Sequence, residues 1–372
     1  MTVVARFPSG PEDLTPALLT QVLAIRHPGV EVATVELASV KRCGEGVAST
    51  ADRVVLDLTY VDGCDGGLPG RMVLKTMLVS PHAPGEMYET EVRFYNEIRP
   101  DLDIETPGAY AAAFDPATSQ FGVLLEDLTV RGARFPDATQ DVTVDEVAAI
   151  LTQLARLHAR YWRSERFAHD LAWVATPSTG GMSGIFERHG LAIIRDQLRR
   201  HPFKAELIKP LGADLDSLWS ALGVSRRILA SAPETLLHGD THIANTYLLP
   251  DGTAGLLDWQ LQVRGCFAHD VIYLICTALT PVARRDEGRQ LLEGYLSELA
   301  ACGVADAPAS DEAWVWCRRA VLWGLVIGWL ITPPENYGEE ITVANTERMV
   351  AAVADLDALG VLHDDQARRD WS

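Results

Sequence analysis

Apolar and polar residues follow two different patterns along the chain, and the change between them falls near residue 130. In the first part, short apolar runs are separated by glycine and polar turns, a pattern typical of β-strands. It predicts helices near 12–25 and 84–98 and strands near 32–41, 52–60, 71–79, 109–114 and 121–126. We therefore expect an antiparallel or mixed sheet with helical segments against it.

The second part of the chain has helical periodicity. Apolar residues recur every three or four positions in segments near 144–166, 185–200, 214–231, 268–280, 284–302, 310–332 and 342–359. A polar stretch over 129–141 separates the two patterns, and 372 residues are too many for one compact core. The sequence thus predicts an α+β chain with two lobes, a small N-terminal lobe over 1–127 and a larger, mainly helical C-terminal lobe over 128–372.

One segment interrupts the helical pattern of the second lobe. It runs from Leu236 to Gln260 and reads LLHGDTHIANTYLLPDGTAGLLDWQ. An Asp-Gly pair between apolar runs is the strongest short signal for a β-hairpin. If Asp251 and Gly252 form a two-residue turn, Asn245 lies directly opposite Asp258 at the open end of that hairpin.

Three side chains of this segment suggest a metal site beside a reacting group. Carboxylate and amide oxygens are hard ligands that Mg²⁺ accepts, which makes Asn245 and Asp258 candidate metal ligands. Asp240 lies five positions before Asn245 and is the candidate base. In phosphoryl transfer an Asp accepts the proton of the substrate hydroxyl, an Asn five residues later binds metal, and so does an Asp beyond a hairpin.

The same chemistry requires a lysine for the phosphates, and the first lobe offers one. Lys75 interrupts the apolar strand RMVLKTMLV, where an unpaired ammonium would be costly. Glu91, in the following helix, is the predicted partner that would orient Lys75 toward the α and β phosphates, with Glu97 as the alternative. An edge-strand lysine that faces water remains open at this point.

Two backbone segments of the first lobe are candidates for nucleotide contacts. The glycines of a loop before Lys75, Gly44 and Gly46, allow close approach to phosphate, and the hydroxyl of Ser49 or of Thr50 could bond its oxygens, although a plain hairpin turn fits equally well.

The second of these segments is a strand that ends in FGVLLEDL. Its end resembles a hinge that contacts adenine through backbone groups. Glu126 and Leu128 are the candidates for those backbone contacts.

These motifs together resemble one known family. HGDTHIAN followed by LLDWQ is similar to the catalytic and metal loops of the aminoglycoside phosphotransferase and choline kinase superfamily, which has the protein-kinase-like fold. The LxEDL, ExxFY and LDWQ motifs resemble most the ecdysteroid-kinase-like branch and its bacterial relatives. The resemblance implies ATP and Mg²⁺ as cofactors, a small-molecule hydroxyl as acceptor, His238 as a structural residue of the catalytic loop and Asp270 as its brace.

Other functions remain open. His238, Asp240 and His242 alternate, which would suit a metal-dependent hydrolase. The chain could also be a catalytically silent kinase-like protein that only binds a nucleotide or ligand, or could act on protein serine. Two kinds of acceptor are possible. Tryptophans of the second lobe would suit an apolar, steroid-like alcohol, whereas Glu335, Glu339 and Glu340 would suit a cationic aminoglycoside.

The composition of the chain limits the kinds of partner that it can bind. A net charge of −19 argues against binding to nucleic acid and to anionic membranes, which require basic surfaces. The six cysteines have no zinc-site spacing and are expected as reduced thiols, and the N-terminal residues lack the apolar core of a signal peptide. The apolar run over 320–332 is too short to span a bilayer and predicts a buried helix. We expect a cytoplasmic monomer or homodimer.

Overall fold

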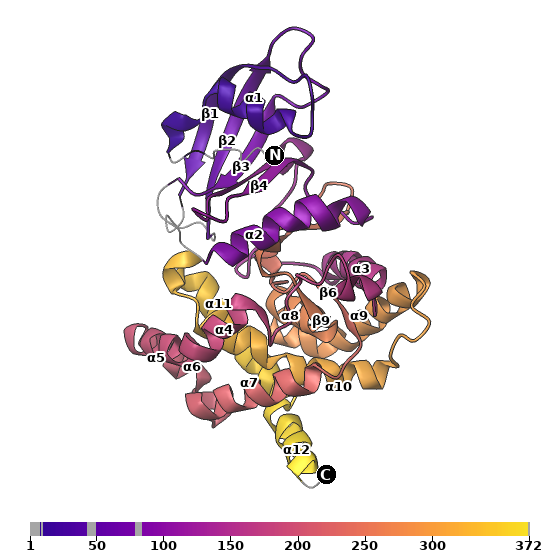
Figure 1. Cartoon of the computed structure of the whole chain (residues 1–372). Helices are drawn as coiled ribbons and strands as arrows, with labels where there is room; N and C mark the ends of the chain where they lie inside the picture. Colours follow the sequence, from indigo (N-terminus) through magenta and orange to yellow (C-terminus); the bar gives the residue numbers. More distant parts are fainter. Residues whose placement is uncertain (1–7, 9, 43–49, 79–83, 371–372) are drawn as a thin grey trace. The chain divides into compact units, whose positions relative to one another are not determined.

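The computed structural model describes residues 8, 10–42, 50–78 and 84–370 (Figure 1). It divides into two compact units. The first comprises Met1–Leu102, Thr106–Ala133 and Glu335–Tyr337, and the second comprises Asp103–Glu105, Arg134–Pro334 and Gly338–Ser372. The lobe bounds expected at residues 127 and 128 stay a prediction.

The described elements of the first unit follow one another in the order expected for a small sheet lobe, with η marking 3-10 and π turns. They are η1 (Pro11–Asp13), α1 (Pro16–Ala24), β1 (Val32–Lys41), β2 (Asp52–Tyr60), β3 (Arg71–Thr76), α2 (Gly85–Arg93), η2 (Phe94–Ile98), η3 (Arg99–Asp101), β4 (Ala109–Phe114), β5 (Phe121–Glu126) and η4 (Leu128–Arg131).

The five strands form one sheet in the order β1-β2-β3-β5-β4, and every neighbouring pair is antiparallel. In β3, Leu74 pairs with Leu124 and belongs to the apolar core that α1 covers with Leu19 and Leu23. Because side chains alternate along a strand, Lys75 points to the opposite face of the sheet from Leu74. The alternation therefore places the lysine away from this core.

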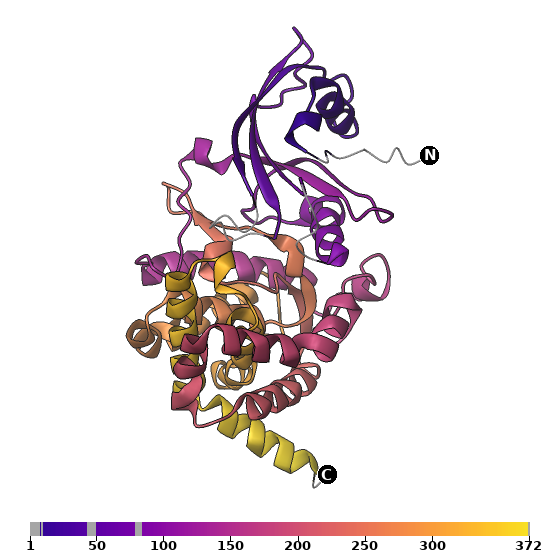
Figure 2. The same cartoon turned by 90° about the vertical axis from the view of Figure 1, so that its left-hand side faces the viewer.

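The second unit is mainly helical, as the segments from magenta to yellow show in Figure 2. Its described elements are α3 (Val144–Tyr161), η5 (Glu165–Ala168), α4 (Gly180–Ile185), η6 (Phe186–Gly190), α5 (Leu191–Arg200), α6 (Pro202–Ile208), η7 (Lys209–Leu211), α7 (Leu215–Leu229), β6 (Glu234–Leu237), η8 (Ile243–Asn245), β7 (Thr246–Leu248), β8 (Ala254–Leu256), η9 (Trp259–Leu261), β9 (Val263–Cys266), α8 (Ala268–Ala278), α9 (Pro281–Ala301), α10 (Ser310–Ala320), η10 (Gly324–Leu330), α11 (Glu339–Asp355) and α12 (Ala358–Asp370). The short turn η11 (Pro334–Asn336) precedes α11.

The first helix of this unit has a clear start signal in the sequence. The hydroxyl of Thr143 accepts the N–H of Glu146, and the carboxylate of Glu146 accepts the N–H of Thr143, which forms a capping box. Apolar residues of α3 are then buried at helical spacing, including Ile150, Leu154 and Leu157. The helix ends at Tyr161 instead of continuing to residue 166.

The catalytic hairpin forms, but its register differs by one residue from the expectation. Asn245 accepts the N–H of Leu257 at 2.8 Å, so Asn245 lies opposite Leu257 and not opposite Asp258. The loop has three residues because Leu249 and Thr253 already bond to each other, and Gly252 takes the left-handed conformation with φ +86°. A three-residue loop with a left-handed glycine is the next most common hairpin after the two-residue turn.

The cysteines and the apolar run over 320–332 are the next features to which the expectations apply. The cysteines among them, at positions 64, 266, 276, 302 and 317, are free thiols. The apolar run over 320–332 forms the end of α10 and the turn η10, with Leu325 and Trp329 buried, so the prediction of a buried segment is confirmed. No helix in the described ranges is both long enough and apolar enough to cross a membrane.

Candidate functional site

The candidate base lies on a loop that leaves a two-stranded ladder. Strand β6 pairs with β9 in antiparallel register, and the loop that follows β6 begins with His238, Gly239 and Asp240. Gly239 has φ +84°, and a Cβ there would lie 2.0 Å from the carbonyl oxygen of Leu261. Only glycine fits both this conformation and this close approach, which explains the HGD sequence locally.

Asp270, in the first turn of α8, hydrogen-bonds to the start of this loop. Its carboxylate accepts the N–H of His238 at 2.7 Å and the N–H of Gly239 at 3.0 Å, and Nε2 of His158 lies 3.2 Å away. Burial by itself would raise the pKa of Asp270, but the hydrogen bond from His158 and the histidine rings around it hold that pKa below its usual value. Asp270 therefore provides a fixed negative charge under the loop.

His238 connects the two loops of the hairpin segment. Its Nε2 donates to the carbonyl oxygen of Leu257 at 2.7 Å, its Nδ1 accepts the N–H of Asp240 at 3.3 Å, and its ring packs 4.6 Å from that of Trp259. Burial lowers the pKa of His238, which agrees with a neutral ring that donates from one nitrogen and accepts at the other. The ring thus ties Asp240 to the segment that carries Asp258.

The other two candidate residues, Asn245 and Asp258, both interact with Asp240. The side-chain amide of Asn245 donates to the backbone oxygen of Asp240 at 2.8 Å and to its carboxylate at 3.1 Å. Burial, followed by the negative charges of Asp258 and Asp270, raises the pKa of Asp240 to about 8, against the lowering effect of the Asn245 hydrogen bond. The site therefore concentrates negative charge that a cation would neutralise.

Asp258 occupies a backbone conformation that side chains rarely adopt. Its φ and ψ are 62° and 78°, in the left-handed region, two residues after the end of the hairpin strand β8 and directly before the turn η9. A residue other than glycine in this region carries a conformational cost of about 1 kcal/mol or more. Such a cost at a carboxylate beside Asp240 is typical of a functional position.

His242 is a residue of this site for which the sequence suggested a role only in hydrolysis. Its Nε2 lies 3.7 Å from the carboxylate of Asp240, and its ring packs against those of Tyr273 and Trp329. Burial lowers the pKa of His242 to about 3, so the ring is neutral at physiological pH. The aromatic environment that buries this histidine comes from α8 and η10, which no local motif could indicate.

Hydrolysis at a histidine-rich metal site is not supported. Throughout the described ranges, no cluster of at least three His, Cys, Asp or Glu side chains is arranged to hold a metal ion. His238 uses both ring nitrogens in hydrogen bonds to the backbone. His238 therefore has no ring nitrogen left to bind a metal in the hydrolase interpretation.

The first unit contains the predicted pair of Lys75 and Glu91. The ammonium lies 2.7 Å from one carboxylate oxygen and 2.9 Å from the other, and the two residues are 3% and 1% exposed. Tyr88, one turn before Glu91 on α2, stacks on Phe121 of β5 and anchors the helix to the sheet. Glu97, the alternative partner, instead pairs with Arg93.

The hinge candidates lie at the end of β5. The N–H of Glu126 donates to Gly108 at 2.8 Å, and the carbonyl oxygen of Leu128 accepts the N–H of Ala133 at 3.2 Å. Asp127 between them is buried and accepts hydrogen bonds from Thr129. The contacts of the Glu126 and Leu128 backbone groups with adenine therefore stay a prediction.

The candidate phosphate loop lies outside the described residues, which exclude positions 43–49. Gly44, Gly46 and Ser49 therefore stay predictions. Thr50 is described, and its carbonyl oxygen accepts the hydroxyl of Tyr88 at 2.8 Å.

Comparison with known proteins gives a consistent picture. The model of the phosphotransferase enzyme family, APH, matches residues 60–312. Curated protein sequences gave no match. Among solved structures, an ethanolamine kinase from Plasmodium vivax aligns with a TM-score of 0.52 at 11% identity, covering 86% of this chain and 81% of that one.

Two further structures align over most of their length with lower scores. Choline kinase from Streptococcus pneumoniae has a TM-score of 0.45 at 16% identity and covers 91% of this chain and 98% of that one. Macrolide 2'-phosphotransferase from Brachybacterium faecium has a TM-score of 0.42 at 17% identity and covers 92% and 98%. At these identities, what the ethanolamine kinase alignment shows is the fold.

Proposed function

Because the chain belongs to the phosphotransferase enzyme family, we propose that it transfers the γ-phosphate of ATP to a hydroxyl group of a small molecule. The observation that carries this proposal is the cluster of Asp240, Asn245 and Asp258, in which the half-buried Asp240 has a pKa raised by desolvation and by the neighbouring carboxylate of Asp258. Within the first unit, the Lys75–Glu91 ion pair is the pair that the same chemistry requires for the nucleotide phosphates.

In this proposal Asp240 orients the acceptor hydroxyl and takes its proton. The Asn245 amide nitrogen holds the Asp240 carboxylate at 3.1 Å, which fixes the direction of that carboxylate. His238 and Asp270 act as structural support, since Asp270 accepts the N–H groups of His238 and Gly239, and His238 Nδ1 accepts the N–H of Asp240. Such catalysis consists mainly of positioning and charge stabilisation.

Magnesium fits the donor set of this site. Asn245 and Asp258 would hold it, because an amide oxygen and a carboxylate are ligands that Mg²⁺ accepts, and because the raised pKa of Asp240 indicates uncompensated negative charge. When bound, the ion would neutralise charge on the phosphate oxygens. Asp240 would then be ionised at neutral pH, because a nearby cation lowers its pKa.

The nucleotide contacts on the first unit are proposed in the same way. Lys75, oriented by Glu91, would bind the α and β phosphates, and Gly44, Gly46 and Ser49 would contact the phosphates through backbone and hydroxyl groups. The Glu126 carbonyl and the Leu128 N–H would bond the adenine edge, one as acceptor and one as donor. We further propose a cytoplasmic location, a monomer or homodimer, and closest kinship with the ecdysteroid-kinase-like branch.

The decisive experiment compares nucleotide binding with phosphate transfer. Wild type and Asp240→Ala are incubated with Mg²⁺, ATP and a library of alcohols, and a gain of one phosphate is sought by mass spectrometry. We expect both proteins to bind Mg²⁺-ATP with similar affinity and only wild type to transfer phosphate. Undiminished transfer by Asp240→Ala would refute the assignment of the base. Nucleotide binding without transfer to any alcohol would favour the silent kinase-like protein.

A further inference from the structure

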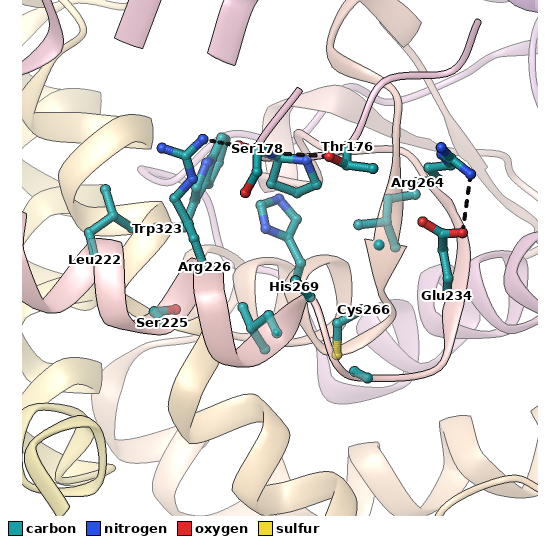
Figure 3. Close-up of a pocket in the computed structure, with 16 residues that line it drawn as sticks. Thr176, Ser178, Leu222, Ser225, Arg226, Glu234, Arg264, Cys266, His269 and Trp323 are labelled. Atoms are coloured by element: carbon teal, nitrogen blue, oxygen red, sulfur yellow. Dashed lines mark hydrogen bonds and ion pairs between the residues drawn. The ribbon is translucent and has the colours of Figure 1, made fainter. Parts of the chain in front are cut away.

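A cavity of about 110 Å³, partly open at the surface, lies in the second unit beside the catalytic loop, and the proposed function leaves it unassigned. Its walls come from the loop over 176–178, the C-terminal half of α7, the β6–β9 ladder, and His269 and Trp323. Figure 3 shows His269 at the centre of the cavity, with Arg226 on one side and Arg264 on the other.

His269 connects the cavity to the loop that carries the candidate base. Its Nε2 donates to the carbonyl oxygen of Gly239 at 3.0 Å, and its ring makes an edge contact with Trp323 at 4.5 Å. Gly239 immediately precedes Asp240, and Leu237 two positions earlier also lines the cavity. A molecule bound here would therefore touch side chains that hold the catalytic loop.

The size of the cavity limits what can enter it. A cavity of about 150 Å³ lined by apolar side chains binds benzene. The cavity beside His269 is somewhat smaller and can enclose one six-membered ring, so the further fused rings of a steroid would lie outside it. A larger acceptor could place only one of its rings inside.

The residues that line the cavity further limit which ligands can bind there. Leu222, Leu229, Leu237 and Trp323 provide apolar contact. Because Nε2 of His269 donates to a carbonyl, Nδ1 of a neutral ring is an acceptor, and burial lowers the pKa of this histidine. The ring of a ligand can therefore carry a hydroxyl that donates to His269.

The charges at the cavity disfavour a cation. Arg264 pairs with Glu234 at 3.3 Å, so these two charges compensate each other. Arg226 donates to the carbonyl oxygen of Pro177 and, at 2.6 Å, to the hydroxyl of Ser183, both of them neutral groups, while Glu187 lies at 3.6 Å and is largely exposed. A protonated amine would enter beside a guanidinium and a neutral histidine, without a buried carboxylate of its own.

We propose that this cavity binds a single neutral, mainly hydrocarbon ring of the acceptor alcohol, and that His269 and Arg226 contact the polar edge of that ring. This inference rests on the proposed function, since it names the class of acceptor for the same active site. It favours an apolar acceptor over a cationic aminoglycoside.

The first test uses two probes of equal size and different charge. Cyclohexanol and cyclohexylamine, which is protonated at pH 7, are titrated into the full-length protein, and binding is measured by ligand-observed NMR. We expect cyclohexanol to bind at least about tenfold more tightly, because burial of an unpaired charge is costly. Equal affinity for the two probes, or no measurable binding of cyclohexanol, would overturn the proposal.

The second test fills the cavity. Leu229→Trp and the smaller change Leu229→Phe place an aromatic ring in the wall, and Ile193→Trp places the same ring on an exposed position of α5, outside the cavity. The Leu229 variants, checked for folding by thermal unfolding, should lose at least about tenfold in cyclohexanol affinity, and Ile193→Trp should not. Undiminished binding in both Leu229 variants would refute the cavity as the site.

A third measurement separates this inference from the proposed function. Mg²⁺-ATP binding and phosphate transfer to neutral and cationic alcohols are followed in the same protein samples. Ring binding that Leu229→Trp abolishes, without transfer to any alcohol, would support the cavity and contradict the phosphotransferase proposal. Transfer to an alcohol whose KM is the same in wild type and Leu229→Trp would contradict the cavity as an acceptor subsite and support the proposed function.

Discussion

The carboxylate of Asp270 accepts the backbone N–H of His238 at 2.7 Å, so a charge at the start of α8 fixes the start of the catalytic loop. The next N–H, that of Gly239, bonds to the other oxygen of the same carboxylate at 3.0 Å. Two successive backbone N–H groups that bond one buried carboxylate resemble an anion-binding site. Here the anion is a side chain of the protein itself. The loop geometry therefore depends on an ionised Asp270.

We expect Asp270→Asn to destabilise the protein by about 1–3 kcal/mol, because one buried N–H loses its charged acceptor. Stability is measured by urea unfolding at pH 7, with the exposed Asp141→Asn as control. The pKa of Asp270 is lowered in the folded state, so its contribution is present above the ordinary carboxyl pKa and is lost as the pH falls below it. The difference between wild type and Asp270→Asn should thus shrink in acid. A constant difference from pH 7 to pH 3 would contradict this role.

Several elements could be predicted from the sequence because local signals agreed with the packing. Strands β4 and β5 begin and end where the apolar pattern predicted, and Glu91 reaches Lys75 because a lysine inside an apolar strand requires a partner. Asp240 and Asn245 lie together since five positions of a tight loop suffice to join them.

Other features depend on contacts that a local pattern cannot reveal. The observed hairpin register differs from the expected one because an Asp251-Gly252 pair fits a three-residue loop as well as a two-residue turn. The short pairing of β6 with β9 joins residues that are 26 to 32 positions apart, and the cavity at His269 requires α7 and Trp323 to meet. Likewise, the pKa of Asp240 follows from burial and from the charges of Asp258, beyond the hairpin, and of Asp270, on α8.

The Lys75–Glu91 pair leads to a prediction about stability. Removal of one partner from a buried ion pair leaves an uncompensated charge, so Lys75→Met should cost about 3–5 kcal/mol in the free energy of unfolding. The double variant Lys75→Met/Glu91→Gln should recover much of that loss because no buried charge remains, while phosphate transfer stays abolished. Urea unfolding and a transfer assay measure the two effects. A double variant no more stable than Lys75→Met would argue against the pair.

Asp258 offers a test of strain retained for function. With φ at 62°, Asp258→Gly removes the left-handed conformational cost and should stabilise the metal-free protein by roughly 0.5–1 kcal/mol, while transfer is lost with the carboxylate. Ser119, with φ 59° in the β4–β5 connection, provides the matched control. Ser119→Gly should gain similar stability and keep full transfer. Wild-type transfer in Asp258→Gly would exclude this carboxylate as a metal ligand.

The raised pKa of Asp240 predicts how the stability of the metal-free protein changes with pH. A folded-state pKa of about 8, above the ordinary value of 3.8, means that the contribution of this carboxyl is complete below about pH 4 and is lost as the pH rises toward 8. In EDTA, the free energy of unfolding of wild type should therefore fall between pH 5 and pH 9 by on the order of 1 kcal/mol or more, since one pKa unit corresponds to about 1.4 kcal/mol.

Asp240→Asn should flatten this pH dependence and be the more stable protein at pH 8, because the amide never ionises beside Asp258 and Asp270. The exposed Asp141→Asn should keep the wild-type slope. Millimolar Mg²⁺ should reduce the slope of wild type as well, since a bound cation favours ionised Asp240, and should leave Asp240→Asn almost unchanged. Urea midpoints at four pH values, with EDTA or Mg²⁺, measure all three effects. If wild type and Asp240→Asn gave parallel pH curves in EDTA, the carboxyl would not be the buried, charge-coupled group that the geometry indicates.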